Sequence, residues 1–148
     1  YKSKKFSRDF ITDIDFVIDL AYGRLSYSYD FMAADSFFNC YGESNLLKDY
    51  PILYFNCSIN SKDKKNLLKK FSIKYKFKNE PFILKTSGHL SLLKNKITFS
   101  EININKKYVA SKEDRQYFKS KFEDILLNQG FTNIFALSKI KEFILEIS

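Results

Sequence analysis

Alternation of large apolar and polar residues is strictest in residues 71–78, near the middle of the chain. Successive side chains of a β-strand point to opposite faces, so a period of two predicts a strand with one apolar and one polar face. Its apolar members are Phe71, Ile73, Tyr75 and Phe77, and its polar members are Ser72, Lys74, Lys76 and Lys78. We expect the segment 71–110 to form the antiparallel sheet around which the rest of the chain packs.

Residues 82–93 continue the strand pattern after a turn at Asn79, Glu80 and Pro81. A glycine inside a strand often marks a bulge, so Ser87 and Gly88 predict an irregularity there. Two earlier runs, residues 25–31 and 52–59, also alternate and are expected to be strands.

Residues 97–110 predict a further strand in which the apolar positions change parity. The positions are Ile97, Phe99, Ile102 and Ile104. One inserted residue near Ser100 and Glu101 would keep all four on one face, which predicts a second bulge. Tight turns are expected before this strand, at residues 94–96, and within it, at residues 105–107.

Helical spacing is expected at both ends of the chain. In residues 7–21 the apolar positions recur as on one helix face, with Ser7 as the cap and Gly23 after the end. Residues 33–41 predict a short helix or turn. Ser111 and Asp114 have the spacing of a capping box, which predicts a helix to about Asn128. A last helix begins at Thr132, or else residues 132–136 form an edge strand and the helix follows Ser138.

These elements predict one α+β domain over residues 1–148. Its expected architecture is an antiparallel β-meander of four to six strands, with an N-terminal helix and one or two C-terminal helices packed on one face. The chain has 148 residues and an apolar fraction of 45%, enough to bury a core without a metal or disulfide. No apolar run approaches the roughly 20 residues of a membrane span, so we expect a cytoplasmic protein with no membrane contact.

The net charge of +8 is spread unevenly. Residues 1–60 carry 6 basic and 8 acidic side chains, whereas residues 61–110 carry 13 basic and 3 acidic ones. The excess is almost all lysine, which suits solubility and loose steering of a partner better than bidentate reading of phosphate or bases. A solvated lysine face is the plainest interpretation.

Two cysteines in a chain of this length do not form a disulfide framework. We expect Cys40 and Cys57 to be free buried thiols, with a single bridge as the alternative. A metal site is the least favoured reading, because the chain has one histidine and no closely spaced cysteine pair. We expect no cofactor.

No motif in the sequence carries recognisable chemistry. His89 lacks a nucleophile in a familiar setting, although Ser87 and Ser91 share its strand face. Asp13 and Asp15 have the Asp-x-Asp spacing of some divalent-cation sites. In the expected helix, however, their side chains would point about 200° apart and could not share a cation. We therefore expect a protein that is not an enzyme.

Two function classes follow from the charge and the aromatic residues. The first is a small binding protein that occludes a protein partner, such as a toxin or an enzyme, as immunity and inhibitor proteins do. The second is a non-specific nucleic-acid binder that uses the lysine face. The residues expected to contact a partner are Lys74, Lys76, Lys78 and Lys85 as steering charges, and Tyr27 and Tyr29 as aromatic anchors.

Overall fold

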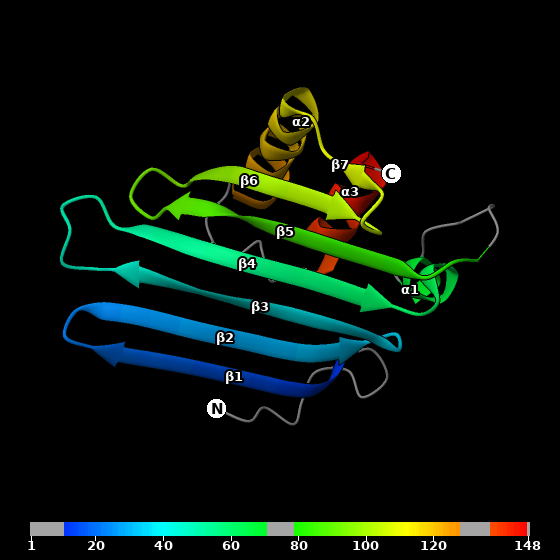
Figure 1. The fold of residues 1–148 in the computed structure, drawn as a ribbon, viewed down its shortest axis with the longest axis horizontal. Coiled ribbons are helices and arrows are strands. Elements are labelled where there is room, and N and C mark those ends of the chain that lie inside the picture. The colour runs from blue at the N-terminus through cyan, green and yellow to red at the C-terminus, as the bar shows by residue number, and fades with distance from the viewer. Residues whose placement is uncertain (1–10, 71–78, 128–136, 148) are drawn as a thin grey trace.

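The computed structural model describes residues 11–70, 79–127 and 137–147. Within them, seven strands form one antiparallel sheet in which each strand pairs with its neighbour in sequence (Figure 1). The strands are Ile11–Ala21 (β1), Arg24–Ala33 (β2), Ser36–Asn45 (β3), Ile52–Ser61 (β4), Phe82–Ser91 (β5), Lys96–Ile104 (β6) and Tyr108–Val109 (β7). The helices are Lys64–Lys70 (α1), Lys112–Phe122 (α2), the π-helical Glu123–Leu127 (η1) and Leu137–Ile147 (α3).

The α+β class and the antiparallel meander are confirmed, but the sheet is larger than expected. It has seven strands, not four to six. The strand expected at residues 71–78, with its lysine face, lies outside the described residues. The helix Lys64–Lys70 precedes that segment, and the sequence analysis predicted no helix there.

The predicted N-terminal helix is wrong over all of its described residues, because Ile11–Ala21 is a strand. The pairing of β1 with β2 shifts by one residue between Thr12 and Asp15, and Asp13 has a positive φ of 52°. This bulge moves the apolar positions from odd to even numbers. As a result, Ile11 and Ile14 are three residues apart, which is also the separation of neighbouring residues on one face of a helix.

The predicted short helix or turn at residues 33–41 is also wrong. Ala33 ends β2, Ala34 and Asp35 form the turn, and β3 begins at Ser36. Pairing on both sides holds β3 in place, with Phe38 opposite Phe31 of β2 and Ile59 of β4. Compact apolar runs without clear alternation are typical of strands between two others, and they cannot be told from buried helices by period alone.

The two irregularities expected in β5 and β6 are confirmed as a single feature. Ser87 pairs with Glu101 and Gly88 pairs with Phe99, so Ser100 is the extra residue. Ile97 and Ile102 are both buried on either side of it, as the change of parity required. Gly88 is needed here because a Cβ would meet the Phe55 ring and the Thr98 carbonyl oxygen.

The helix capped by Ser111 is confirmed. Its hydroxyl oxygen accepts a hydrogen bond from the Asp114 amide, while the Asp114 carboxylate accepts one from the Ser111 amide, both at 3.1 Å. The helical run continues through η1 to Leu127, close to the expected end. The alternatives for residues 132–136 lie outside the described residues, and α3 runs from Leu137 to Ile147.

The sheet has an apolar face and a polar face, and the C-terminal helices pack on the apolar one. A buried cluster joins Phe55, Leu90 and Ile97 of the sheet to Leu127 of η1. The rings of Phe99 and Phe122 meet edge to face at 5.7 Å, which links β6 to α2. Figure 1 shows α2 and α3 gathered at the β5–β6 side, with β1 at the opposite edge.

Candidate functional site

The apolar face is exposed where it extends over β1. Phe16, Ile18 and Leu20 alternate along this strand, and their side chains are 39%, 55% and 62% exposed. Each lies opposite an apolar or aromatic residue of β2, namely Tyr29, Tyr27 and Leu25. Isolated exposed apolar residues are ordinary on protein surfaces, but a row that continues a core-forming face marks a candidate binding surface.

Four aromatic rings run from the edge strand toward the middle of the sheet. Phe16 meets Tyr29 edge to face at 5.6 Å, Tyr29 lies 5.1 Å from Phe31, and Phe31 stacks on Phe38 at 4.5 Å. We call Phe16, Tyr29, Phe31 and Phe38 the aromatic row. Rings held against one another lose little side-chain freedom on binding, so such a row is suited to recognition.

The aromatic row ends in a hollow of about 230 Å³ over β2 to β5. The hollow is lined by Phe31, Phe38, Asn39, Cys40, Cys57, Ser58, Ile59, Leu84 and Thr86. Its volume is below the roughly 300–1,000 Å³ of sites for small molecules and cofactors. A hollow of this size and apolar lining is better suited to one or two side chains of a protein partner.

A disulfide between Cys40 and Cys57 forms part of the wall of the hollow. The expectation of two free thiols is therefore wrong, and the alternative of a single bridge is correct. The two residues lie directly opposite each other on β3 and β4, which brings their sulfur atoms together. The sequence does not indicate the bridge, because only the pairing of β3 with β4 sets the two cysteines opposite each other.

Tyr27 and Tyr29, the expected anchors, both lie on the apolar face. Tyr29 belongs to the aromatic row. Tyr27 pairs with Gly42, where a Cβ would meet the Tyr27 ring, and its hydroxyl oxygen lies 4.0 Å from the Cys40 sulfur. Burial raises the pKa of both phenols, so both remain neutral donors at physiological pH.

Lys85, the one expected steering residue that the structure describes, lies apart from these tyrosines. It is exposed on the polar face of β5, opposite Ser58 and Asn103. Lys74, Lys76 and Lys78 lie outside the described residues. The structure therefore places the expected anchors and Lys85 on opposite faces of the sheet.

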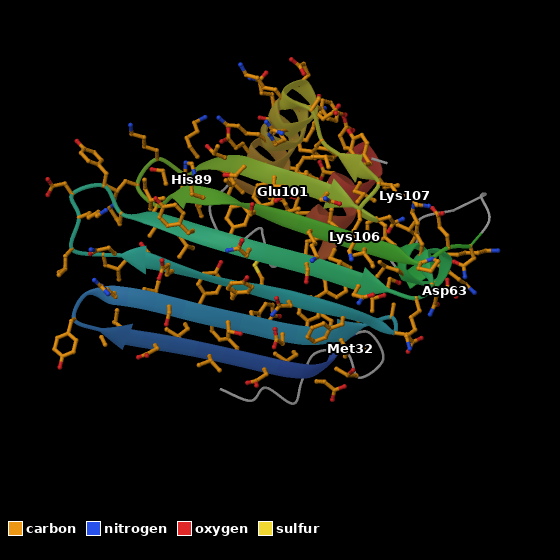
Figure 2. The ribbon with its side chains drawn as sticks, in the orientation of Figure 1. Met32, Asp63, His89, Glu101, Lys106 and Lys107 are labelled. Carbon is orange, nitrogen blue, oxygen red and sulfur yellow. A yellow bond between two sulfur atoms is a disulfide. The ribbon has the colours of Figure 1, made fainter. Side chains whose placement is uncertain are left out.

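Acidic side chains predominate in β1 to β3, and basic ones predominate in the helix, turns and strands that follow. Residues 11–45, which form β1 to β3, carry six acidic side chains and one basic one. Residues 46–70 and 79–110 together carry four acidic and eleven basic side chains. On the polar face, His89 lies over β5 and Met32 over β2, while Lys106 and Lys107 follow the end of β6 (Figure 2).

The other chemical candidates are not assembled into a site. His89 lies opposite Tyr54 and Thr98, with its ring 6.0 Å from that of Tyr54. In the described ranges, no three histidine, cysteine, aspartate or glutamate side chains are grouped so as to hold a metal ion. No helix in the same ranges is both long and apolar enough to cross a membrane.

The residues that the sequence analysis missed are Phe16, Ile18, Leu20, Phe31 and Phe38. Phe31 and Phe38 fall in segments whose pairing was not foreseen, and the other three fall in the presumed helix. A partial strand signal was present, because Phe16, Ile18 and Leu20 alternate with Asp15 and Asp19, but the apolar Val17 breaks the alternation.

Comparison of the chain with protein-family models, with curated proteins and with solved structures found no match. Any inference about function therefore rests on the surface described above.

Proposed function

We propose that this protein is a non-enzymatic binding module that holds another protein against the exposed part of its apolar sheet face. The aromatic row carries the proposal, because it begins at the exposed edge of the sheet and ends in a hollow of side-chain size. Protein interfaces concentrate their binding energy in a few aromatic anchors seated in such hollows.

Occlusion is the mode of action that this surface supports best. A partner seated on β1 to β3 would have the contacting part of its own surface covered. This suits a protein that neutralises a toxin or an enzyme by blocking it. The acidic side chains of β1 and β2, Asp15, Asp19 and Asp30, lie on the opposite, polar face, so they do not contact a partner on the apolar face. They can still speed the approach of a basic partner by long-range steering.

The test compares two phenylalanines of similar exposure on opposite faces. Phe16, on the apolar face, is 39% exposed, and Phe37, on the polar face, is 43% exposed. Protein retained from a native extract by the wild-type chain should be lost with Phe16→Ser and kept with Phe37→Ser. Equal retention by both variants would refute the proposed surface, and no retention by the wild type would refute protein binding.

Nucleic acid is the alternative ligand, and the same two variants separate it from a protein partner. Binding to random DNA and RNA should be measured across a salt series, because phosphate contacts weaken steeply with salt. Salt-dependent binding that both variants retain would favour the nucleic-acid alternative. The polar face gives that alternative limited support, because Asp15, Asp30 and Glu101 share it with Lys85.

A further inference from the structure

The outer edge of β1 has no partner strand within the described part of the chain. The sheet order runs from β1 to β7, so β1 pairs with β2 on one side only. A strand in this position presents a row of unpaired backbone N–H and C=O groups. Those groups are the template onto which an extended peptide adds in β-augmentation.

The usual protections of an edge strand are concentrated at the beginning of β1. The bulge between Thr12 and Asp15 disturbs the backbone pairing near the beginning of the strand. From Asp15 to Ala21 the pairing with β2 is unbroken, and this stretch has no proline and no lysine. Natural edge strands commonly use bulges, prolines and charged side chains to prevent pairing. The second half of β1 has only the charges of Asp15 and Asp19, which oppose an acidic strand but not a basic one.

The side chains of β1 specify what an added strand should carry. Phe16, Ile18 and Leu20 point to the apolar face, and Asp15, Val17 and Asp19 point to the polar face. Directly opposite residues on neighbouring antiparallel strands share a face and interact. An added strand therefore matches β1 best when apolar residues alternate with basic ones.

The negative charge of β1 favours a basic strand over a second copy of this chain as the occupant of its outer edge. The ionisable side chains of β1 are Asp13, Asp15 and Asp19, and none takes part in the ion pairs of the described residues. Asp15 already lies opposite Asp30 of β2. A second β1 would bring three more aspartates to the same seam, whereas lysine or arginine would neutralise those present.

We propose that β1 is the docking edge for an extended segment of a partner protein in which apolar and basic residues alternate. This inference rests on the proposed protein-binding function and states where and how the partner docks. The segment continues the sheet beyond β1. Its apolar side chains lie against Phe16, Ile18 and Leu20, and its basic ones lie beside Asp15 and Asp19.

The test uses two capped peptides as long as the regular part of β1, one alternating valine with lysine and the other alternating valine with glutamate. The wild-type chain should bind the lysine peptide about tenfold more tightly, a difference of about 1.4 kcal/mol. The double variant Asp15→Lys/Asp19→Lys should reverse the preference. Both substituted residues are exposed, so the fold should persist.

The control applies the same change of net charge elsewhere. Glu113→Lys/Asp124→Lys alters exposed residues of the C-terminal helical segment and should leave the preference for the lysine peptide in place. If this variant also reverses the preference, peptide binding depends only on the net charge of the protein, and the inference is wrong.

Hydrogen exchange of the β1 amides distinguishes strand addition from other binding. Amides on the outer edge of β1 should exchange more slowly when the lysine peptide is bound, because they gain backbone hydrogen bonds. Binding without this protection overturns the inference. Concentration-dependent dimerisation that protects the same amides also overturns it, with a second copy as the occupant.

Failure of this inference can be told from failure of the proposed function. A natural partner that is lost with Phe16→Ser but retained with Asp15→Lys/Asp19→Lys, without protection of β1, would leave the proposed function standing and remove strand addition. Absence of any protein partner would remove both.

Discussion

Asp15 lies directly opposite Asp30 across the β1–β2 pair, on the polar face of the sheet. Like charges in directly opposite positions destabilise an antiparallel pair. Asp30 is fixed by Asn39 of β3, whose side-chain amide donates to its carboxylate at 2.5 Å. The edge of the sheet therefore has two like charges in opposite positions, and a cation beside Asp15 would offset them.

Replacing Asp15 by Asn should stabilise the isolated protein. We expect the free energy of unfolding to rise by about 0.5 kcal/mol at neutral pH and low salt, because the repulsion from Asp30 is removed. Asp19→Asn is the matched control, since Asp19 lies opposite Ser26 and should change stability less. A denaturant titration in which Asp15→Asn is the less stable of the two would contradict the register.

Replacing Leu90 or Leu20 by alanine should show which part of the apolar face is packed. Leu90 is 5% exposed in the core under the C-terminal helices, whereas Leu20 is 62% exposed on β1. Leu90→Ala should lower the free energy of unfolding by about 2–5 kcal/mol, as truncation of a buried leucine does. Leu20→Ala should change it by about 0.5 kcal/mol or less. Similar losses in the two variants would show that β1 is also covered.

Two buried serines should respond differently to replacement by alanine. The Ser36 hydroxyl donates to Ser61 Oγ at 2.8 Å, so Ser36→Ala should destabilise by about 1 kcal/mol. The Ser44 hydroxyl is buried between Leu25 and Leu53 and has no hydrogen-bond partner among the described residues. Ser44→Ala removes that unsatisfied group and should leave stability unchanged or raise it. Thermal unfolding of the two variants decides the matter.

The Cys40–Cys57 bridge should be detectable and stabilising. Non-reducing mass spectrometry should give a mass lower by two hydrogen atoms, and thiol titration in denaturant should find no free thiol before reduction. The bridge spans a sequence separation of 17 residues, so its reduction should cost about 3 kcal/mol. The double variant Cys40→Ser/Cys57→Ser should be insensitive to reductant. Two free thiols in the purified, unreduced protein would contradict the bridge.

The hydroxyl of Tyr108 should make stability depend on pH through Asp114. It donates to the Asp114 carboxylate at 2.5 Å, and this hydrogen bond, followed by those from Ser111, lowers the pKa of Asp114. A lowered pKa contributes stability above the unfolded-state value, and that stability is lost as pH falls through the folded-state value. Tyr108→Phe should therefore be less stable than the wild type at neutral pH and converge with it in acid.

Tyr22→Phe provides the control for this pH dependence. Its side chain is 98% exposed, and its hydroxyl makes no hydrogen bond to the described residues. The difference between Tyr22→Phe and the wild type should stay flat from neutral to acid pH. A convergence of the same size in both variants would mean that Asp114 is not its source.

Elements whose signals are local can be read from the amino-acid sequence alone. The capping box of Ser111 and Asp114 satisfies amides within one helical turn, so four residues were enough to place it. The change of parity between Phe99 and Ile102 located the bulge in β6, because only an inserted residue keeps both side chains inward. The same reasoning applied to β1 would have explained the three-residue step from Ile11 to Ile14 as a bulge.

The edge of the sheet, by contrast, is set by contacts between segments that are distant in the sequence. Residues 11–21 satisfy both a helical and a strand pattern, and pairing with β2 selects the strand. Cys40 and Cys57 are separated in sequence and meet only because β3 and β4 pair in a register that sets them opposite each other. The aromatic row likewise combines three strands. Its rings come together through interstrand register, which depends on contacts between segments and not on the residues of any one segment.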